Sequence, residues 1–521
     1  MSIEAILNLE DLKKYFIEGL EESKKFSSIF YPTNKTLSDY QISLAKKSTS
    51  LNTFMNTVFM GSINGAWINM FDAPKSICDG CELENTKIHF GVGTTGWYFL
   101  CGTAGDIGFN FNIMRQEIVP PKISKKYGLD KSETVRWCIS GGFGKIGDTV
   151  FYNTLSDWIY MKYTQYSETT FKLSGSCPTT DLTFETIKPM TFNFTLNFVD
   201  TTGKTHNINI LLSGNSSPEG NYPNSCQVCQ DGIGNFYYSY TDMDIIVTAD
   251  SGKTQYGKKT GWIDHQFWKS SYVKGVYSQA LVYLLNSISN RINNGWLWFA
   301  IQDVESNTQY MLTHHYIKNY SEINKGDNLD TDMVNVYRNG VAYYNPTKVD
   351  MDSGDLNIIL TETIQVSGVN ISLPSSYNIT LPGGKKVVLK ICTAPNVYLG
   401  SAIASYETPA LLYSEDGKTV IGSGLIEANM YLEKDVLAKR FISLAGGNPD
   451  DRSEYNTVYN AMDSKKSFGK LLLAFIIVFI PLWIIITLIV FVVKEKEPNR
   501  RKNRLMLAIA LFLIFYLFWK S

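Results

Sequence analysis

Apolar and polar positions alternate most clearly between residues 237 and 268 of the chain. Two runs rich in aromatic and β-branched residues, 237–249 and 255–268, flank the polar turn Ser251-Gly252-Lys253, and this pattern predicts a β-hairpin. Because successive side chains of a strand point to opposite faces, Trp262 and Asp264 are expected on one face of the second strand and His265 on the other. A buried polar residue of this kind is usually hydrogen-bonded, so the grouping is compatible with packing alone as well as with a functional carboxyl group.

Further short runs of the same type follow one another along the chain and predict an all-β body with the spacing of a sandwich or an up-and-down barrel. The predicted strands are 134–140, 149–160, 170–173, 190–199, 206–212, 294–302, 308–316, 356–366, 385–392 and 422–431. Helical spacing of apolar residues instead predicts an amphipathic helix over 3–25. Two other helices are expected near 40–60 and 276–290.

The C-terminal part of the chain has the pattern of a membrane anchor. A polar linker, 441–469, precedes an apolar stretch over 471–493, which is long enough to span a bilayer. A basic loop, 494–504, follows. After it comes a shorter apolar stretch, 505–519, which is compatible with a second, thin or tilted span and with a re-entrant or interfacial segment. We therefore expect the lipid bilayer to be a partner and residues 470–521 to form a transmembrane helical hairpin. Pro481 is a candidate kink.

The orientation of this anchor has two interpretations. The basic loop favours a cytoplasmic loop and barrels on the opposite side of the membrane. An N-terminal segment that carries acidic residues and has no continuous apolar core does not resemble a secretion signal. The second observation favours soluble domains on the cytosolic side, which is the orientation we expect.

Composition narrows the classes of partner. The formal net charge is −1 and aromatic residues make up 13% of the chain, a balance that argues against a general nucleic-acid binder. Frequent Asn, Lys, Ile and Tyr are typical of AT-rich genomes such as those of protists and large DNA viruses. Anchoring in a cell membrane and anchoring in a virion membrane are both open, as are oligomers and other membrane partners.

Cysteine spacing offers one candidate metal site. Eight Cys include two Cys-x-x-Cys pairs, Cys78/Cys81 and Cys226/Cys229, and four such thiolates are the ligand set of a structural zinc ion. Local disulfides, redox pairs and free thiols are the alternatives. No phosphate-binding Gly loop or nucleophile elbow is present, so no other cofactor is expected.

Four blocks carry a resemblance to a known family. They are Gly261-Trp262-Ile263-Asp264-His265-Gln266-Phe267-Trp268, Gly96-Trp97-Tyr98 with Gly102, the stretch 294–302 (NGWLWFAIQ), and the stretch 422–431 (GSGLIEANMY). In this order they resemble the carotenoid 1,2-hydratase (hydroxyneurosporene synthase) and AttH group, over about residues 85–437. The resemblance implies a mainly β protein with two tandem lipocalin-like antiparallel β-barrels. These barrels would be 86–275 and 276–440, preceded by a helical and irregular segment, 1–85.

The resemblance also implies site residues. Asp264 is the implied acid and His265 its partner or the water-positioning base. The implied ligand-binding residues are Trp262, Tyr238, Trp97, Tyr98, Trp296, Trp298, Gln302, Glu427 and Tyr431. The chain departs from the family pattern at Thr95 and Gly96, which replace an acid and a Trp, and at Leu297, which replaces an Asp.

Two functions follow from these patterns. The first, which we prefer on sequence alone, is a membrane-anchored module whose double barrel binds an apolar isoprenoid or lipid molecule, or serves as a structural element of a cell or virion membrane. The second is a hydratase that adds water to an isoprenoid or lipid double bond by acid catalysis. The hydratase requires the carboxyl of Asp264 to face an enclosed space lined by aromatic rings, whereas the membrane-anchored module needs no acid, only a packed or hollow barrel.

Overall fold

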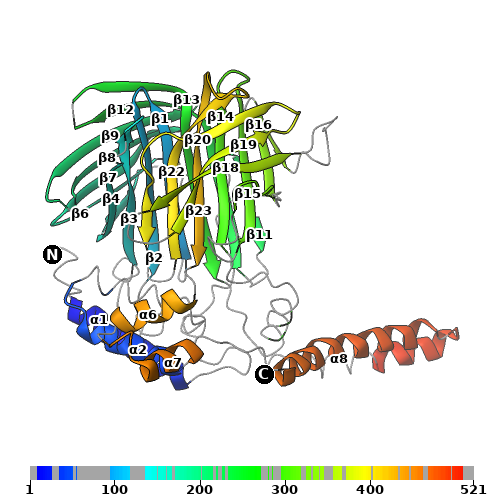
Figure 1. Ribbon diagram of the computed structural model, residues 1–521. Coiled ribbons are helices and arrows are strands. Elements are labelled where there is room, and N and C mark those ends of the chain that lie inside the picture. The colour runs from blue at the N-terminus through cyan, green and yellow to red at the C-terminus, as the bar shows by residue number, and fades with distance from the viewer. Residues whose placement is uncertain are drawn as a thin grey trace.

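Antiparallel strands make up most of this computed structural model, and they form two separate hydrogen-bonded sheets (Figure 1). Strands between residues 94 and 270 form the first sheet, and strands between 295 and 431 form the second. The structure describes residues 9–25, 35–50, 54, 94–117, 135–148, 151–159, 161–166, 170–200, 202–214, 219–220, 226–228, 233–250, 252–270, 280, 284, 295–317, 324–329, 333–338, 341–344, 356–366, 371–399, 403–431, 434–444, 447–461, 468–494 and 496–507.

The first sheet has 13 strands in the order β4-β3-β2-β1-β13-β12-β9-β8-β7-β6-β5, with β10 and β11 paired to β12. Their bounds are β1 Thr94–Ala104, β2 Ile107–Glu117, β3 Val135–Lys145, β4 Phe151–Ile159, β5 Met161–Gln165, β6 Phe171–Cys177, β7 Thr180–Lys188, β8 Thr191–Val199, β9 Thr205–Gly214, β10 Glu219–Gly220, β11 Cys226–Val228, β12 Ile233–Ala249 and β13 Thr254–Ser270.

The second sheet has 10 strands in the order β17-β16-β15-β14-β23-β22-β20-β19-β18, with β21 paired to β22. Their bounds are β14 Gly295–Asp303, β15 Thr308–Ile317, β16 Met333–Arg338, β17 Val341–Tyr344, β18 Asn357–Val366, β19 Ile371–Thr380, β20 Lys386–Ile391, β21 Val397–Leu399, β22 Ile403–Ser414 and β23 Val420–Tyr431. Every strand that the sequence predicted overlaps one of these strands.

The two sheets share one topology. In each sheet the first strand pairs with the last, β1 with β13 and β14 with β23. We call these two pairs the closing pairs. The two strands at the open edges follow each other in the chain, β4 and β5 in the first sheet and β17 and β18 in the second. Each sheet is therefore curled and nearly closed, which is consistent with the predicted tandem lipocalin-like barrels. We refer to the two units as the first and second barrel.

Every second side chain along the strands points inward, and these side chains fill the two barrel interiors. Along β8, Phe192, Phe194, Leu196 and Phe198 point into the first barrel and are buried, while the residues between them are partly exposed. A second interior cluster, built around side chains such as Phe299, fills the second barrel. Burying one side chain of this size stabilises a fold by about 1.5–3 kcal/mol, so the two interiors hold the curvature of the sheets.

Helices from both ends of the chain pack together beneath the sheets (Figure 1). Leu44 from the N-terminal part lies in one buried cluster with Ala438, Ile442 and Val458 from the C-terminal part. The helices are α1 Leu9–Lys25, α2 Lys35–Lys47, α6 Lys434–Leu444 and α7 Arg452–Ala461. The predicted first helix is confirmed over the residues that are described, and the second begins and ends earlier than predicted.

The stretch 441–469 differs from a plain linker because it contains α7. The side chain of Val458 on this helix is fully buried, and the hydroxyl of Tyr40 on α2 donates to Oε1 of Glu454 on α7 at 2.9 Å. Tyr455 and Tyr459 of α7 pack against the same cluster, and the Tyr455 hydroxyl donates to Asp435 on α6 at 2.7 Å, so apolar and polar contacts together dock this short helix. The predicted helix over 276–290 lies outside the described residues except for the helical positions Ala280 and Leu284.

The last long helix, α8 (Phe468–Val493), extends away from the barrels (Figure 1). Its first turns pack Ala474 and Val478 against Ala280 and Leu284, and its side chains at 481, 482, 485 and 488 are not described. Over the residues that the structure does describe, no helix is both long and apolar enough to cross a membrane. Of the predicted second span, 505–519, only the first three residues are described.

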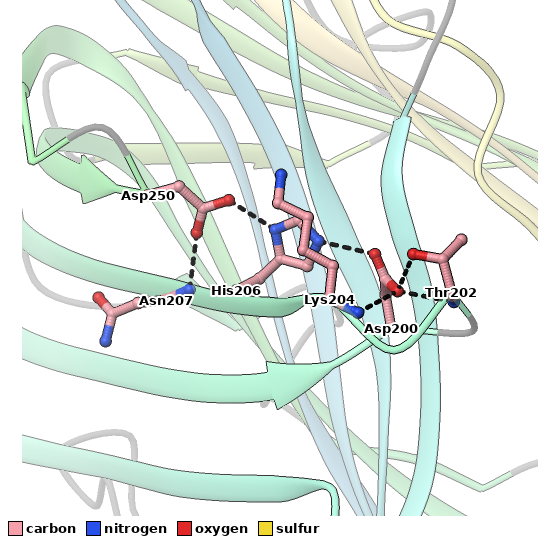
Figure 2. A network of polar contacts seen from close by, with 6 residues as sticks. All are labelled: Asp200, Thr202, Lys204, His206, Asn207 and Asp250. Atoms are coloured by element: carbon pink, nitrogen blue, oxygen red, sulfur yellow. Dashed lines mark hydrogen bonds and ion pairs between the residues drawn. The ribbon is translucent and has the colours of Figure 1, made fainter.

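A network of polar contacts ties two hairpins together at the rim of the first barrel (Figure 2). The buried ring of His206 has Nε2 2.9 Å from Oδ2 of Asp200 and Nδ1 2.5 Å from Oδ2 of Asp250. Asp200 also accepts the backbone N–H groups of Thr202 and Lys204. Since Asp250 belongs to the turn between β12 and β13, His206 joins this turn to the β8–β9 hairpin. Nothing in this network lies on the face that carries Asp264.

Candidate functional site

The closing pairs of the two barrels face each other, and Asp264 lies between them. Along β13, Ile263 points into the interior of the first barrel. Trp262 belongs instead to a cluster that also contains Trp298 and Tyr337 of the second barrel. Alternation along β13 therefore places Asp264 on the outer face of the first barrel, where the second barrel covers it. The rings expected around this acid form a packed cluster at the junction between the barrels and do not line the interior of one barrel.

His265 lies on the other side of the sheet. Its ring stacks on Tyr98 at a centroid distance of 4.1 Å and an interplanar angle of 4°, and Tyr98 packs against Phe184 inside the first barrel. The proposed pairing of His265 with Asp264 is therefore wrong, because neighbouring residues of a strand point to opposite faces. Tyr98 is likewise an interior residue and not part of a site around Asp264.

The carboxyl group of Asp264 is buried and accepts two neutral donors. Oδ1 accepts the hydroxyl of Ser239 at 2.5 Å and the indole N–H of Trp262 at 2.6 Å. The Asp264 residue is only 3% exposed. Both donors belong to the first barrel, and they fix the orientation of the carboxyl group.

Aromatic rings from both barrels pack around Trp262, whose indole N–H donates to this carboxyl group. Trp262 lies edge-to-face with Trp298 at 5.9 Å and with Tyr337 at 5.8 Å. Phe99 of β1 meets Trp298 in the same manner at 6.0 Å. Such pairs contribute about 0.5–1.5 kcal/mol beyond the burial of their area. The rings therefore hold the two barrels together as well as line the junction.

Two further carboxyl groups reach the junction from the second barrel. Glu407 on β22 and Glu427 on β23 are direct cross-strand partners, and directly opposite side chains of an antiparallel pair have Cβ atoms about 4.5–5.5 Å apart. Glu427 accepts the indole N–H of Trp296 at 2.7 Å. Glu407 accepts the side-chain amide of Asn110 from the first barrel at 3.2 Å.

The environment of Glu427 favours its protonated form. Removal from water is the largest cause, and the negative charge of Glu407 adds to it, so the pKa of Glu427 lies well above its ordinary value. The Trp296 N–H acts in the opposite direction and Asp264 adds a further, smaller increase. Glu427 is therefore the carboxyl group of this site that is suited to carry a proton.

The thiol of Cys101 lies at the same junction, in the cluster that contains Phe99 and Trp262. Burial raises its pKa well above the ordinary value, and the charges of Asp264, Glu407 and Glu427 raise it further. Cys101 therefore stays protonated at the centre of the junction. It is one of four free cysteines among the described residues.

Gln302 joins the barrels rather than facing a ligand. Its side-chain amide donates to the carbonyl oxygen of Gly261 on β13, and its Oε1 accepts the hydroxyl of Ser423 at 2.6 Å. The side chain is 1% exposed. Its polar atoms have partners within the protein, which makes Gln302 a positioning residue for the junction.

Some predicted site residues are only partly described. Trp97, Tyr238 and Tyr431 lie on β1, β12 and β23, but their side chains are outside the described set. In the strand register Tyr238 is the partner of His265 and not of Asp264. Of the predicted zinc ligands Cys78, Cys81, Cys226 and Cys229, only the backbone of Cys226, on β11, is described. No group of three or more potential metal ligands occurs in the described part of the chain.

The sequence did not indicate Glu407, Asn110, Phe99 or Tyr337 as site residues. The two closing pairs repeat the same arrangement, and this repeat points to the acid of the second barrel. Asp264 is the register partner of Phe99, three residues after Gly96, and Glu427 is the register partner of Trp298, three residues after Gly295. The two acids therefore occupy equivalent positions in the two barrels.

Comparison with known proteins gives structural neighbours only. No family model matches the chain, and no curated protein matches it. An AttH protein from Nitrosomonas europaea is similar with a TM-score of 0.46 and 12% identity, over 70% of this chain and 99% of that one. Kievitone hydratase from Nectria haematococca follows with a TM-score of 0.37 and 10% identity, over 69% and 97%.

A third neighbour, CghA in complex with Sch210972, has a TM-score of 0.36 and 9% identity, over 70% of this chain and 98% of that one. At this level of similarity the neighbours assign no activity to the chain. The resemblance to carotenoid 1,2-hydratases stays a prediction from the sequence motifs.

Proposed function

We propose that the protein is a hydratase-type enzyme that adds water to a carbon–carbon double bond of a largely apolar substrate held between the two barrels. The observation that carries this proposal is the position of Glu427 directly opposite Glu407 at the junction, where Trp296 and Asn110 donate to the two carboxyl groups. A pair of facing carboxyl groups that shares one proton supplies an acid and a base at the same place. Both are needed to add the two parts of water.

In the proposed reaction the Glu427 carboxyl gives its proton to one carbon of the double bond. The π electrons form the new C–H bond, and the other carbon becomes a cation. A water oxygen attacks that carbon and its surplus proton passes to the Glu407 carboxylate. Transfer of this proton across the cross-strand pair restores the starting state, so alkene and water become an alcohol with no cofactor consumed.

Asp264 and the rings support the cationic stage. A carboxylate fixed by Ser239 and Trp262 attracts positive charge that develops nearby. The faces of Trp and Tyr rings attract cations by about 0.5–2 kcal/mol. Asp264 therefore changes from the proton donor of the sequence-based hypothesis to a stabilising group, while Glu427 takes the role of acid.

The test uses the purified full chain, a linear isoprenoid hydrocarbon and water labelled with 18O. Turnover is expected to yield an alcohol that carries the label, detected by mass spectrometry, and Asp264→Asn is expected to reduce its rate. Unlabelled alcohol, or the same amount of labelled product without protein, would contradict enzymatic hydration.

We also propose that the C-terminal region anchors the protein in a bilayer. Side chains on several faces of α8 support this, because Phe475, Trp483, Ile489 and Val493 are 51%, 67%, 56% and 61% exposed. The guanidinium of Arg504 donates to the carbonyl of Phe491 at 3.1 Å, which supports a chain that turns back along α8 after Lys494.

Anchoring predicts how the expressed protein partitions. The full chain is expected to stay in the membrane pellet after alkaline carbonate washing. A chain that ends at Gly447, before α7, should move to the supernatant, and so should one that ends at Ala461. If the full chain is washed off as readily as the truncated chains, the anchor proposal fails and α8 is a docking helix.

Binding of an apolar molecule without turnover is the second candidate function. The rings of Phe99, Trp262, Trp298 and Tyr337 favour it, since they form an apolar junction that needs no acid. Recovery of a bound isoprenoid or lipid from the purified protein, together with no labelled alcohol in the hydration assay, would favour this function over the enzyme.

A further inference from the structure

Four polar side chains lie in one row across the outer face of the second barrel. In the register of neighbouring strands, Thr313 on β15 is the partner of Trp298 on β14. Trp298 is the partner of Glu427 on β23, and Glu427 is the partner of Glu407 on β22. Adjacent strands are about 4.8 Å apart. A hydroxyl, an indole N–H and two carboxyl groups therefore follow one another at roughly this interval.

The first two side chains of this row, Thr313 and Trp298, carry buried polar atoms that make no hydrogen bond to any described residue. Trp298 is 4% exposed and Thr313 is 2% exposed. Neither the indole Nε1 of Trp298 nor the hydroxyl Oγ1 of Thr313 has a hydrogen-bond partner in the described structure. Buried donors of this kind are nearly always satisfied in native proteins, by protein groups, ordered water or a ligand. Two neighbouring exceptions beside a carboxyl pair indicate a place where an external oxygen binds.

The chemistry of the two groups defines what they can hold. An indole N–H only donates, whereas a threonine hydroxyl both donates and accepts. A carbonyl oxygen can accept from both, and an alcohol can accept from Trp298 while donating to Thr313. Around them lie apolar groups of the same cluster, including Ala300, Met311 and Leu425. These surroundings suit a molecule whose only polar group at this end is one oxygen.

We propose that Trp298 and Thr313 form an oxygen subsite that binds the hydroxyl or carbonyl of an otherwise apolar substrate and thereby places its double bond over Glu427. This inference rests on the proposed function and narrows it, because the substrate class becomes oxygenated apolar molecules, such as linear isoprenoid alcohols and ketones, rather than pure hydrocarbons. One strand spacing separates the subsite from Glu427, so the double bond lies a few carbon–carbon bonds from the oxygen.

The test measures the hydrogen bond directly on a bound probe. The probe is a linear isoprenoid ketone labelled with 13C at its carbonyl, and its isotope-edited infrared band is recorded when it is bound to the full chain. We expect the band to shift to lower wavenumber relative to its position in an alkane solvent. In Trp298→Phe most of this shift should disappear, and the affinity for the ketone should fall roughly tenfold, the factor that corresponds to about 1.4 kcal/mol.

Matched variants separate this role from a structural one. Thr313→Val keeps the shape of the side chain and should remove the remaining part of the shift, which keeps the test informative even where Trp298→Phe folds poorly. Trp296→Phe removes an indole N–H that already donates to Glu427 and should leave the band unchanged. A hydrocarbon of the same length should bind equally to the wild type and to Thr313→Val.

The two proposals fail in different ways. An unshifted band in the wild-type complex, or a shift that survives both Trp298→Phe and Thr313→Val, overturns the oxygen subsite even if hydration is observed. A shifted band that depends on these residues, in a protein without hydration activity, supports the subsite and overturns only the proposed reaction.

Discussion

Replacing Glu427 by Gln is expected to lower the rate of hydration by about 10²–10⁴-fold, the range over which a positioned general acid accelerates a reaction. Glutamine keeps the size of the side chain and can still accept the indole N–H of Trp296, but it has no acidic proton to give. The rate constant for conversion of bound substrate should fall, while binding of the isoprenoid ketone probe should change little. The measurement is turnover with 18O-labelled water at saturating substrate.

The stability of the folded protein should also depend on pH through Glu427. Desolvation and the charge of Glu407 raise the pKa of Glu427 in the folded protein above its value in the unfolded chain. The stability linked to this group is therefore fully present below the unfolded pKa and is lost as pH rises through the folded pKa. The melting temperature of the wild type should decline over that window and then level off. In Glu427→Gln this part of the decline should be absent, so the variant should be more stable than the wild type at the alkaline end.

Glu415→Gln is the matched control. Glu415 is 68% exposed and pairs with Lys386 on the surface of the second barrel, so its replacement should change neither rate nor pH profile. A Glu427→Gln protein with wild-type turnover would show that the proton comes from elsewhere. If Glu407→Gln loses activity while Glu427→Gln keeps it, Glu407 is the acid instead of Glu427.

Replacing Trp262 by Ala is expected to reduce the free energy of unfolding by about 3–5 kcal/mol, as for other large aromatic side chains removed from a packed interior. Trp262 is fully buried and its ring meets Trp298 and Tyr337 of the second barrel. Its loss removes apolar contacts between the barrels and one of the donors to Asp264. The melting temperature of the full chain should fall sharply, and calorimetry should reveal whether the barrels then unfold in separate steps.

Two variants divide this effect into its parts. Trp262→Phe keeps a ring but removes the N–H that Asp264 accepts at 2.6 Å, which should cost about 1–3 kcal/mol. Tyr256→Ala changes an aromatic residue on the same strand that is 69% exposed, and it should stay within about 0.5 kcal/mol of the wild type. Equal stability of Trp262→Ala and Tyr256→Ala would contradict a packed junction between the barrels.

Alternation along β13 was enough to predict that Trp262 and Asp264 share one face and that His265 lies on the other. It was not enough to predict which face belongs to the barrel interior. Both faces of this strand are buried, one by the interior of the first barrel and one by the second barrel. A strand buried on both sides has no polar face that would reveal its orientation.

Glu407 was missed for a different reason. The strand β22 carries Glu407 and Pro409 in its middle, and acidic residues and proline are depleted in strands. A short-range pattern therefore indicates a turn where the structure has a 12-residue strand. The site also depends on side-chain contacts between strands of different sheets, such as the hydrogen bond from Asn110 to Glu407, and no periodicity within one strand contains that information.

The equivalent positions of Asp264 and Glu427 have an evolutionary consequence. Two units of the same strand topology, each with an acid on its last strand at the junction, are what duplication of one barrel within a chain produces. In an assembly of two identical single-barrel chains, both acids would have the same residue opposite them. Within one chain each half changes independently, and here Ser239 stands opposite Asp264 while Glu407 stands opposite Glu427.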